Sequence, residues 1–124
     1  MQIITTTDAP APIGPYNQAV VHNGLVYVSG QIALHPVSSN LVQDSLTSET
    51  HQVMRNLQAV LKAAGTDFSK AIKTTIFLKE MSFFAEVNEV YGRYFDKHFP
   101  ARETVAVQGL PMDVRVEISM IAAV

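Results

Sequence analysis

The chain has 124 residues and a mass of 13.6 kDa, which predicts a single domain over residues 1–124. Hydrophobic residues make up 48% of the chain and charged residues only 16%, below the roughly 25% charged residues that soluble domains average. A net charge of −2 and a pI of about 6.0 do not predict broad affinity for nucleic acid, which usually requires a clustered basic face.

The residue types exclude further classes of site. The chain has no cysteine, which rules out disulfides, thiol nucleophiles and thiolate metal sites. Its four histidines (His22, His35, His51 and His98) show no metal-ligand spacing, so we expect no bound metal. The N-terminus lacks the features of a signal peptide, and no segment approaches the ~20 apolar residues of a membrane span. We therefore expect a cytoplasmic protein.

The N-terminal part predicts a loop followed by a β-hairpin. Three prolines and a glycine between Asp8 and Pro15 exclude a helix or a central strand there. The hairpin covers Ala19–Ser29, because Asn23-Gly24 favours a type I′ turn between two apolar runs. A polar loop follows over Pro36–Asn40.

The middle of the chain predicts a helix and a strand. Apolar residues at 3.6-residue spacing indicate a helix from Ser48 to Ala64, with Ser48 as its N-cap and Gly65 as its stop signal. Residues 72–79 alternate as a strand, which would place four side chains on one side: Ile72, Thr74, Ile76 and Leu78.

The C-terminal part predicts a second helix and two strands. The helix runs from about Phe83 to Phe95 with Ser82 as its cap, and Pro100 ends the region. The strands are Thr104–Val107 and Val114–Ala123, joined through Gly109-Leu110-Pro111. This order of elements predicts an α+β fold, with one mixed β-sheet and two helices packed on one face.

The last strand alternates between two kinds of side chain. On the side expected to face the helices lie Val114, Val116, Ile118 and Met120, and on the other lie Arg115, Glu117, Ser119 and Ile121. The second side mixes charge with apolar residues and needs a partner or solvent. It is a candidate subunit contact.

Arg102 and Glu117 are the leading candidates for chemistry. An arginine binds small carboxylates through two parallel hydrogen bonds, and a nearby carboxylate can hold or deprotonate a water. Together they suggest a site that grips a small organic acid and hydrates it. Two simpler interpretations stay open: Arg102 as a surface residue that caps the preceding helix, and Glu117 as an ordinary residue of a solvated strand face.

The motifs taken together closely resemble the RidA family, also called YjgF or reactive-intermediate deaminase. The match covers nearly the whole chain, and its combination of short motifs is specific even though each motif alone is weak. The matching segments are Gly14-Pro15-Tyr16-Asn17-Gln18-Ala19, Val28-Ser29-Gly30-Gln31, Asn56-Leu57, Ala63-Ala64-Gly65, Lys73–Leu78, Asn88-Glu89-Val90-Tyr91, Phe95, Pro100-Ala101-Arg102, Leu110-Pro111 and Val116-Glu117-Ile118.

The resemblance implies a chorismate-mutase-like fold assembled as a homotrimer, with clefts between subunits. It implies hydrolysis of 2-imino acids and their enamines (2-aminoacrylate, 2-iminopropanoate and 2-iminobutanoate) to 2-keto acids and ammonia, without a cofactor. Arg102 would clamp the substrate carboxylate and Glu117 would orient the attacking water. The backbone of Thr104 would help to hold substrate or water, and the cleft would be lined by Tyr16, Ser29 and Asn88.

One segment departs from the family pattern. Relatives often have Ile-Asp-Pro and a glycine turn where this chain has Leu34-His35-Pro36-Val37-Ser38-Ser39-Asn40, which leaves the shape of that loop open. Two other functions also stay open. One is an endoribonuclease or translation inhibitor, against which the acidic balance and the scattered histidines argue. The other is a non-catalytic module that binds small carboxylates, which would need Arg102 but no water-orienting acid.

Overall fold

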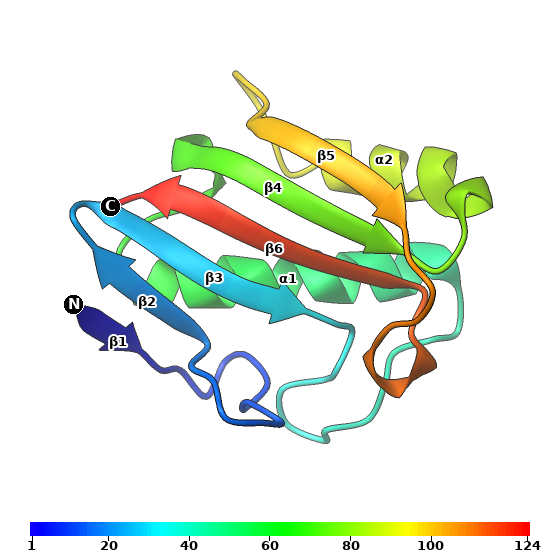
Figure 1. The fold of residues 1–124 in the computed structure, drawn as a ribbon, viewed down its shortest axis with the longest axis horizontal. Helices are drawn as coiled ribbons and strands as arrows, with labels where there is room; N and C mark the ends of the chain where they lie inside the picture. The colour runs from blue at the N-terminus through cyan, green and yellow to red at the C-terminus, as the bar shows by residue number, and fades with distance from the viewer.

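The six strands of the protein form one mixed sheet in the order β1-β2-β3-β6-β4-β5, in a computed structural model that describes residues 1–124 (Figure 1). The strands are β1 (Gln2–Ile4), β2 (Ala19–His22), β3 (Leu25–Gln31), β4 (Ala71–Leu78), β5 (Ala101–Ala106) and β6 (Val116–Ala123). The α-helices are α1 (Leu46–Ala63) and α2 (Phe84–Gly92). Three short 3₁₀ turns are η1 (Phe68–Lys70), η2 (Met81–Phe83) and η3 (Pro111–Asp113).

The last strand of the chain occupies the centre of the sheet. β6 pairs antiparallel with β3 on one side and with β4 on the other. β5 pairs parallel with β4 at the edge, a connection that needs a crossover, and α2 supplies it. β5 and β6 are therefore consecutive strands separated by β4.

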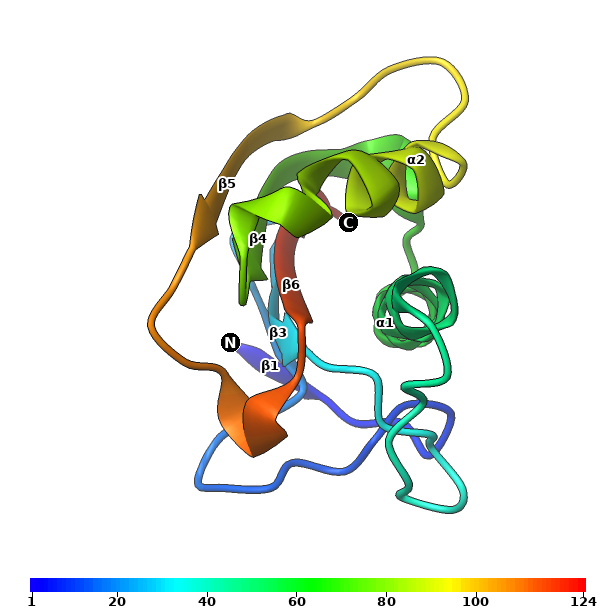
Figure 2. The same cartoon turned by 90° about the vertical axis from the view of Figure 1, so that its right-hand side faces the viewer.

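Both helices cover the same face of the sheet, as predicted (Figure 2). Val116, Ile118 and Met120 of β6 are at most 2% exposed and pack in one core with the apolar stripe of α1. This confirms the helical spacing of the apolar residues and the inward side of the last strand. Neither helix has the length and apolar character that crossing a membrane requires.

The hairpin and the end of the first helix are as predicted, but the start of that helix is not. Asn23 and Gly24 have φ of 51° and 78°, the positive angles of a type I′ turn, and Gly65 has φ +82° after α1. However, α1 begins at Leu46, and Ser45 is the N-cap, because its Oγ accepts a hydrogen bond from the Ser48 amide at 3.0 Å. The prediction of Ser48 as cap was therefore wrong.

The second helix is shorter than predicted. Ser82 lies inside the η2 turn, and Phe83 precedes α2 without a side-chain cap. The helix ends at Gly92, a poor helix former, where the Arg93 amide turns back to the Val90 carbonyl at 3.1 Å. The prediction that it is capped by Ser82 and extends to Phe95 was wrong at both ends.

Two strands also differ in detail, and β1 was not predicted. A register shift between Ala71 and Lys73 at the start of β4 leaves Ile72 46% exposed, so it does not share the buried side of that strand. β5 starts at Ala101, three residues earlier than predicted, and so includes Arg102.

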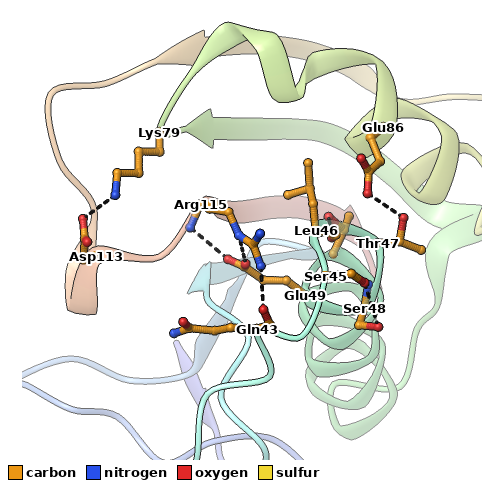
Figure 3. Close-up of polar contacts among 11 residues, drawn as sticks. Gln43, Ser45, Leu46, Thr47, Ser48, Glu49, Lys79, Glu86, Asp113 and Arg115 are labelled. Atoms are coloured by element: carbon orange, nitrogen blue, oxygen red, sulfur yellow. Dashed lines mark hydrogen bonds and ion pairs between the residues drawn. The ribbon is translucent and has the colours of Figure 1, made fainter.

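Buried polar side chains of α1 fix the segments next to the central strands. The Asn56 amide donates to the carbonyl oxygens of Ile32 (3.1 Å) and Leu34 (2.9 Å), just after β3, and accepts from Gln52 at 2.9 Å. Glu49 holds Arg115 just before β6 (Figure 3). Arg115 thus turns toward α1, which corrects the prediction that it shares the outer side with Glu117.

We expect Asn56→Ala to lower the free energy of unfolding by about 3 kcal/mol, because it leaves two buried carbonyls and the Gln52 amide without their partner. Urea denaturation measures the loss. Gln58→Ala is the matched control, since Gln58 is exposed on the same helix. A loss for Asn56→Ala as small as that of the control would contradict the assignment.

Candidate functional site

A pocket of about 320 Å³ contains Glu117 on the sheet face away from the helices. It opens between the N-terminal loop, the end of β3, the η3 turn and β6. Its lining residues are Ile13, Tyr16, Ser29, Gly30, Ile32, Pro111 and Glu117. Three of the residues predicted to form the site, Tyr16, Ser29 and Glu117, therefore lie together, in a largely apolar setting.

Glu117 is half-buried, and burial raises the pKa of its carboxyl above the ordinary value for glutamate. Burial is the only cause, since no charged side chain of the same chain acts on it. Tyr16 is the one other titratable residue that lines the pocket. A carboxyl group with a raised pKa is a stronger base than an exposed glutamate, which suits proton transfer from water.

Gly30 makes room for the Glu117 carboxylate. A Cβ atom at position 30 would lie 2.8 Å from the Glu117 Cδ and still closer to Oε2, distances that real side chains do not show. The register of β3 against β6 shifts between Val28 and Gln31, so the backbone at Gly30 departs from regular pairing. The sequence shows Gly30 only as part of the family segment Val28-Ser29-Gly30-Gln31, because its steric role depends on a contact across strands.

The N-terminal loop is tied down where it borders this pocket. The Tyr16 hydroxyl accepts a hydrogen bond from the Ile13 amide at 3.2 Å, and the Tyr16 amide donates to the Gly14 carbonyl at 2.9 Å. The Ser29 hydroxyl donates to the Asn17 carbonyl at 2.6 Å. These bonds place the Tyr16 ring and the Ser29 side chain at the pocket wall.

A second pocket, of about 310 Å³, contains Arg102 between β5 and α2. It is lined by Asn88, Tyr91, Gly92, Phe99, Pro100 and Arg102. The Arg102 guanidinium carbon lies 5.1 Å from the centre of the Tyr91 ring and 5.7 Å from that of Phe84, which are cation–π distances. Arg102 takes part in none of the four ion pairs of the structure, so its hydrogen-bonding fork is available to a carboxylate.

The stacking partners of Arg102 are themselves fixed. The Tyr91 hydroxyl donates to Thr74 Oγ1 at 3.1 Å, and burial raises the pKa of Tyr91, against the opposing effects of that bond and of Arg102. Two residues further along β5, the Thr104 Oγ1 is buried without a hydrogen-bond partner. Thr104 lines neither pocket, so the structure does not bring it together with the other predicted site residues.

Arg102 and Glu117 point to opposite faces of the sheet. Arg102 aligns with Thr74 of β4, which faces α2, whereas Glu117 aligns with Phe77 of β4, on the other face. One chain thus brings Arg102 together with Asn88, and Glu117 with Tyr16 and Ser29, but does not bring the two groups together. A site that uses both needs two copies of the chain.

Other predicted features lie outside these two pockets. None of the four histidines lines either pocket, and no three His, Asp or Glu side chains are grouped so that they could hold a metal ion. The loop over residues 35–40 lines neither pocket; the His35 Nδ1 accepts from the amides of Val37 and Ser38 instead.

We expect Gly30→Ala to push the Glu117 side chain out of its pocket toward solvent, so that the pKa of Glu117 falls toward the ordinary value. Carbon-13 NMR titration of the glutamate carboxyls measures this change, with Glu117→Gln to assign the signal. Gly109→Ala is the control, because a Cβ there meets nothing within 4 Å. An unchanged Glu117 titration in Gly30→Ala would refute the steric role.

Comparison with known proteins places the chain in a family. The family model "Endoribonuclease L-PSP" matches residues 6–124. A "Putative regulator AldR" of Lactococcus lactis is 52% identical over 100% of this chain and 98% of its own length. A "2-iminobutanoate/2-iminopropanoate deaminase" of Mus musculus is 47% identical over 98% of this chain and 90% of its own length.

The same family appears among solved structures. The crystal structure of RidA from an Antarctic Psychrobacter is 35% identical and superposes with a TM-score of 0.96, covering 100% of both chains. The six-stranded mixed sheet with two helices on one face is thus the fold of this family as well as of this chain. The chain belongs to the RidA (YjgF, L-PSP) family.

Proposed function

We propose that the protein hydrolyses small 2-imino acids, and the enamines that tautomerise to them, to 2-keto acids and ammonia, in sites shared between the subunits of a homotrimer. The observation that carries the proposal is the pair of incomplete half-sites: a stacked arginine with no carboxylate partner, and a half-buried glutamate on the opposite face. The name of the mouse relative supports the same chemistry.

Arg102 binds the substrate carboxylate. Its guanidinium carbon lies at cation–π distance from the rings of Tyr91 and Phe84, which restrict its position before the substrate arrives, and the fork can then form two parallel N–H bonds. Asn88 lines the same pocket, and the backbone of Thr104, two residues further along β5, helps to hold substrate or water. This half-site fixes the imine carbon in place.

Glu117 supplies the base from the neighbouring subunit. It accepts a proton from a water whose oxygen bonds to the imine carbon, which gives a carbinolamine. The protonated carboxyl then returns that proton to the amine nitrogen, the C–N bond breaks, and the departing ammonia takes the hydroxyl proton as the carbonyl forms. One iminium and one water thus yield one keto acid and one ammonium ion, and the Glu117 carboxylate is regenerated. No metal or organic cofactor takes part in these steps.

The uncovered face of the sheet supports assembly. Tyr27 of β3 and Val105 of β5 are 42% and 43% exposed, and they align with Ile121 and Phe77 on the side away from the helices. An apolar sheet face of this kind is a protein interaction site. The shared site further requires that a neighbouring copy turn its edge strand β5, which carries Arg102, toward the Glu117 pocket.

An endoribonuclease remains the second candidate, because the family model carries that description. Neither pocket offers a histidine for phosphodiester cleavage. Incubation with single-stranded RNA at low and high salt separates the two functions: cleavage that persists in Glu117→Gln and Arg102→Ala would require a site other than the one proposed.

Replacing Arg102 and replacing Glu117 should have different effects on turnover and on binding of 2-oxobutyrate. Arg102→Ala should lose both turnover and binding of 2-oxobutyrate, because a bidentate charged contact contributes on the order of 1.5–3 kcal/mol. Arg102→Lys should rescue little, since a point charge does not reproduce the fork. Glu117→Gln should bind 2-oxobutyrate but lose most turnover. Calorimetric titration beside a coupled imine assay measures both.

Two results would contradict these roles. Parent-like binding of 2-oxobutyrate by Arg102→Ala would show that the carboxylate is held elsewhere. Full turnover by Glu117→Gln would show that another group activates the water. An exposed arginine outside both pockets provides the matched control: Arg55→Lys on α1 should change neither measurement.

Subunit mixing tests whether the site is shared. Light scattering should give the mass of a trimer. Refolding equal amounts of Arg102→Ala and Glu117→Gln together should restore about a quarter of the parent activity, because that fraction of the interfaces in a cyclic trimer combines one intact Arg102 with one intact Glu117. Mixing Arg102→Ala with the double variant is the inactive control. A monomer, or a mixture without recovery, would refute the shared site.

A further inference from the structure

The segment between η3 and β6 connects two walls of the Glu117 pocket. It begins at Pro111, which lines the pocket, and it leads into Glu117. Inside it, Met112 and Asp113 have φ of 55° and 56°, left-handed angles that residues other than glycine rarely adopt. Such a conformation persists only where the surrounding structure holds it.

Two groups hold this segment, one from each side (Figure 3). From the end of β4, the Lys79 amide donates to the Arg115 carbonyl at 2.9 Å, and the Lys79 Nζ lies 2.9 Å from the Asp113 carboxylate. From α1, the Glu49 carboxylate accepts from the Arg115 amide at 2.9 Å through Oε2 and from the Arg115 Nε at 2.7 Å through Oε1. Arg115 also donates through Nη2 to the Gln43 carbonyl at 2.9 Å.

The two anchors differ in burial. The Lys79–Asp113 pair is exposed, with side chains 42% and 82% accessible, and an exposed pair contributes little. The Glu49 side chain is only 1% accessible, whereas that of Arg115 is 31% accessible. Burying a carboxylate is costly unless all of its oxygens are bonded, and both oxygens of Glu49 are used by one residue.

The bond to the backbone is the informative part of this contact. A salt bridge alone would fix the Arg115 side chain, but Oε2 of Glu49 holds the main-chain amide two residues before Glu117. A strand is stiff over two residues, so the place of that amide sets where Glu117 leaves the sheet. On β6 the first inward residue, Val116, is fully buried, which transmits the constraint.

We propose that Glu49 is a positioning residue for Glu117: by holding the Arg115 amide it fixes the start of β6, and so the depth at which the Glu117 carboxylate sits against Gly30. The positioning itself is a property of the fold. Its effect on turnover rests on the proposed function, in which Glu117 is the base and Arg102 of a neighbouring copy binds the substrate.

Four variants distinguish the bond between Glu49 and the Arg115 amide from the neighbouring side-chain ion pairs. Glu49→Gln has one acceptor oxygen for the two Arg115 donors, so its N–H group opposes one of them and the two-oxygen contact breaks. Glu49→Asp keeps the charge but is too short to reach both donors. Arg115→Lys keeps the backbone amide and the charge. Asp113→Asn removes the exposed pair and retains a residue that tolerates a left-handed φ.

The primary measurement needs no enzyme activity. Carbon-13 NMR titration reports the Glu117 carboxyl directly in each variant, in the assembled protein. Glu49→Gln and Glu49→Asp should lower the Glu117 pKa by about half a unit or more, since a displaced carboxylate becomes more hydrated. Arg115→Lys and Asp113→Asn should leave it at the parent value. Tyr16, and Arg102 of a neighbouring copy, face Glu117 equally in all four variants.

Steady-state kinetics then test the catalytic consequence. Glu49→Gln should lower kcat about tenfold, because a misplaced base loses efficiency, and should change KM less than about twofold, because Arg102 is untouched. A lower Tm for both Glu49 variants with a parent-like Glu117 titration would overturn the positioning role. A shifted titration with parent kcat would overturn the link to turnover. An inactive parent would refute the proposed function while leaving the titration test intact.

Discussion

The alternation of side chains along the central strand β6 is the constraint on which the rest of this structure depends. β6 is hydrogen-bonded on both edges, so its residues have no freedom to rotate out of register. Burying Val116 and Ile118 against the helices therefore forces Glu117 to the opposite face. The side chains of β5 alternate in the same way, and because Arg102 aligns with Thr74 of β4, it points toward α2. The strand registers thus fix the face on which each side chain lies, and they place Arg102 and Glu117 on opposite faces.

This separation ties any joint chemistry to assembly. A carboxylate held half-buried on its own has a raised pKa, and an arginine without an ionic partner is stabilised only by its aromatic neighbours. Bringing an Arg102 from a second copy toward Glu117 would favour the ionised carboxylate and oppose the effect of burial. In the proposed trimer the base strength of Glu117 is thus set by two opposing terms, one from its own subunit and one from the neighbour.

Local patterns predicted the elements, and long-range contacts decided the details. The Asn23-Gly24 turn depends on two adjacent residues, and the apolar stripe of α1 on a single helix, so both could be predicted from the sequence. The cap could not be assigned from the sequence, because Ser45 and Ser48 are both good capping residues. The orientation of Arg115 depends on Glu49, 66 positions earlier, which no local pattern reports. The resemblance to a family named candidate site residues and implied clefts between subunits, but it did not show that one chain divides these residues between two faces.

The divided site also explains where the costly features of the chain are concentrated. A missing side chain at Gly30, two left-handed residues after Pro111 and the buried carboxylate of Glu49 each carry a cost that a purely structural sheet would avoid. All three lie in, or contact, the stretch of chain from Pro111 to Glu117. In the proposed assembly each half-site forms before the subunits meet, so each subunit must orient its own group by itself. Two aromatic rings restrict the position of Arg102. A carboxylate in an apolar pocket needs more: the missing side chain at Gly30 gives Glu117 its space, and the anchored start of β6 fixes its backbone.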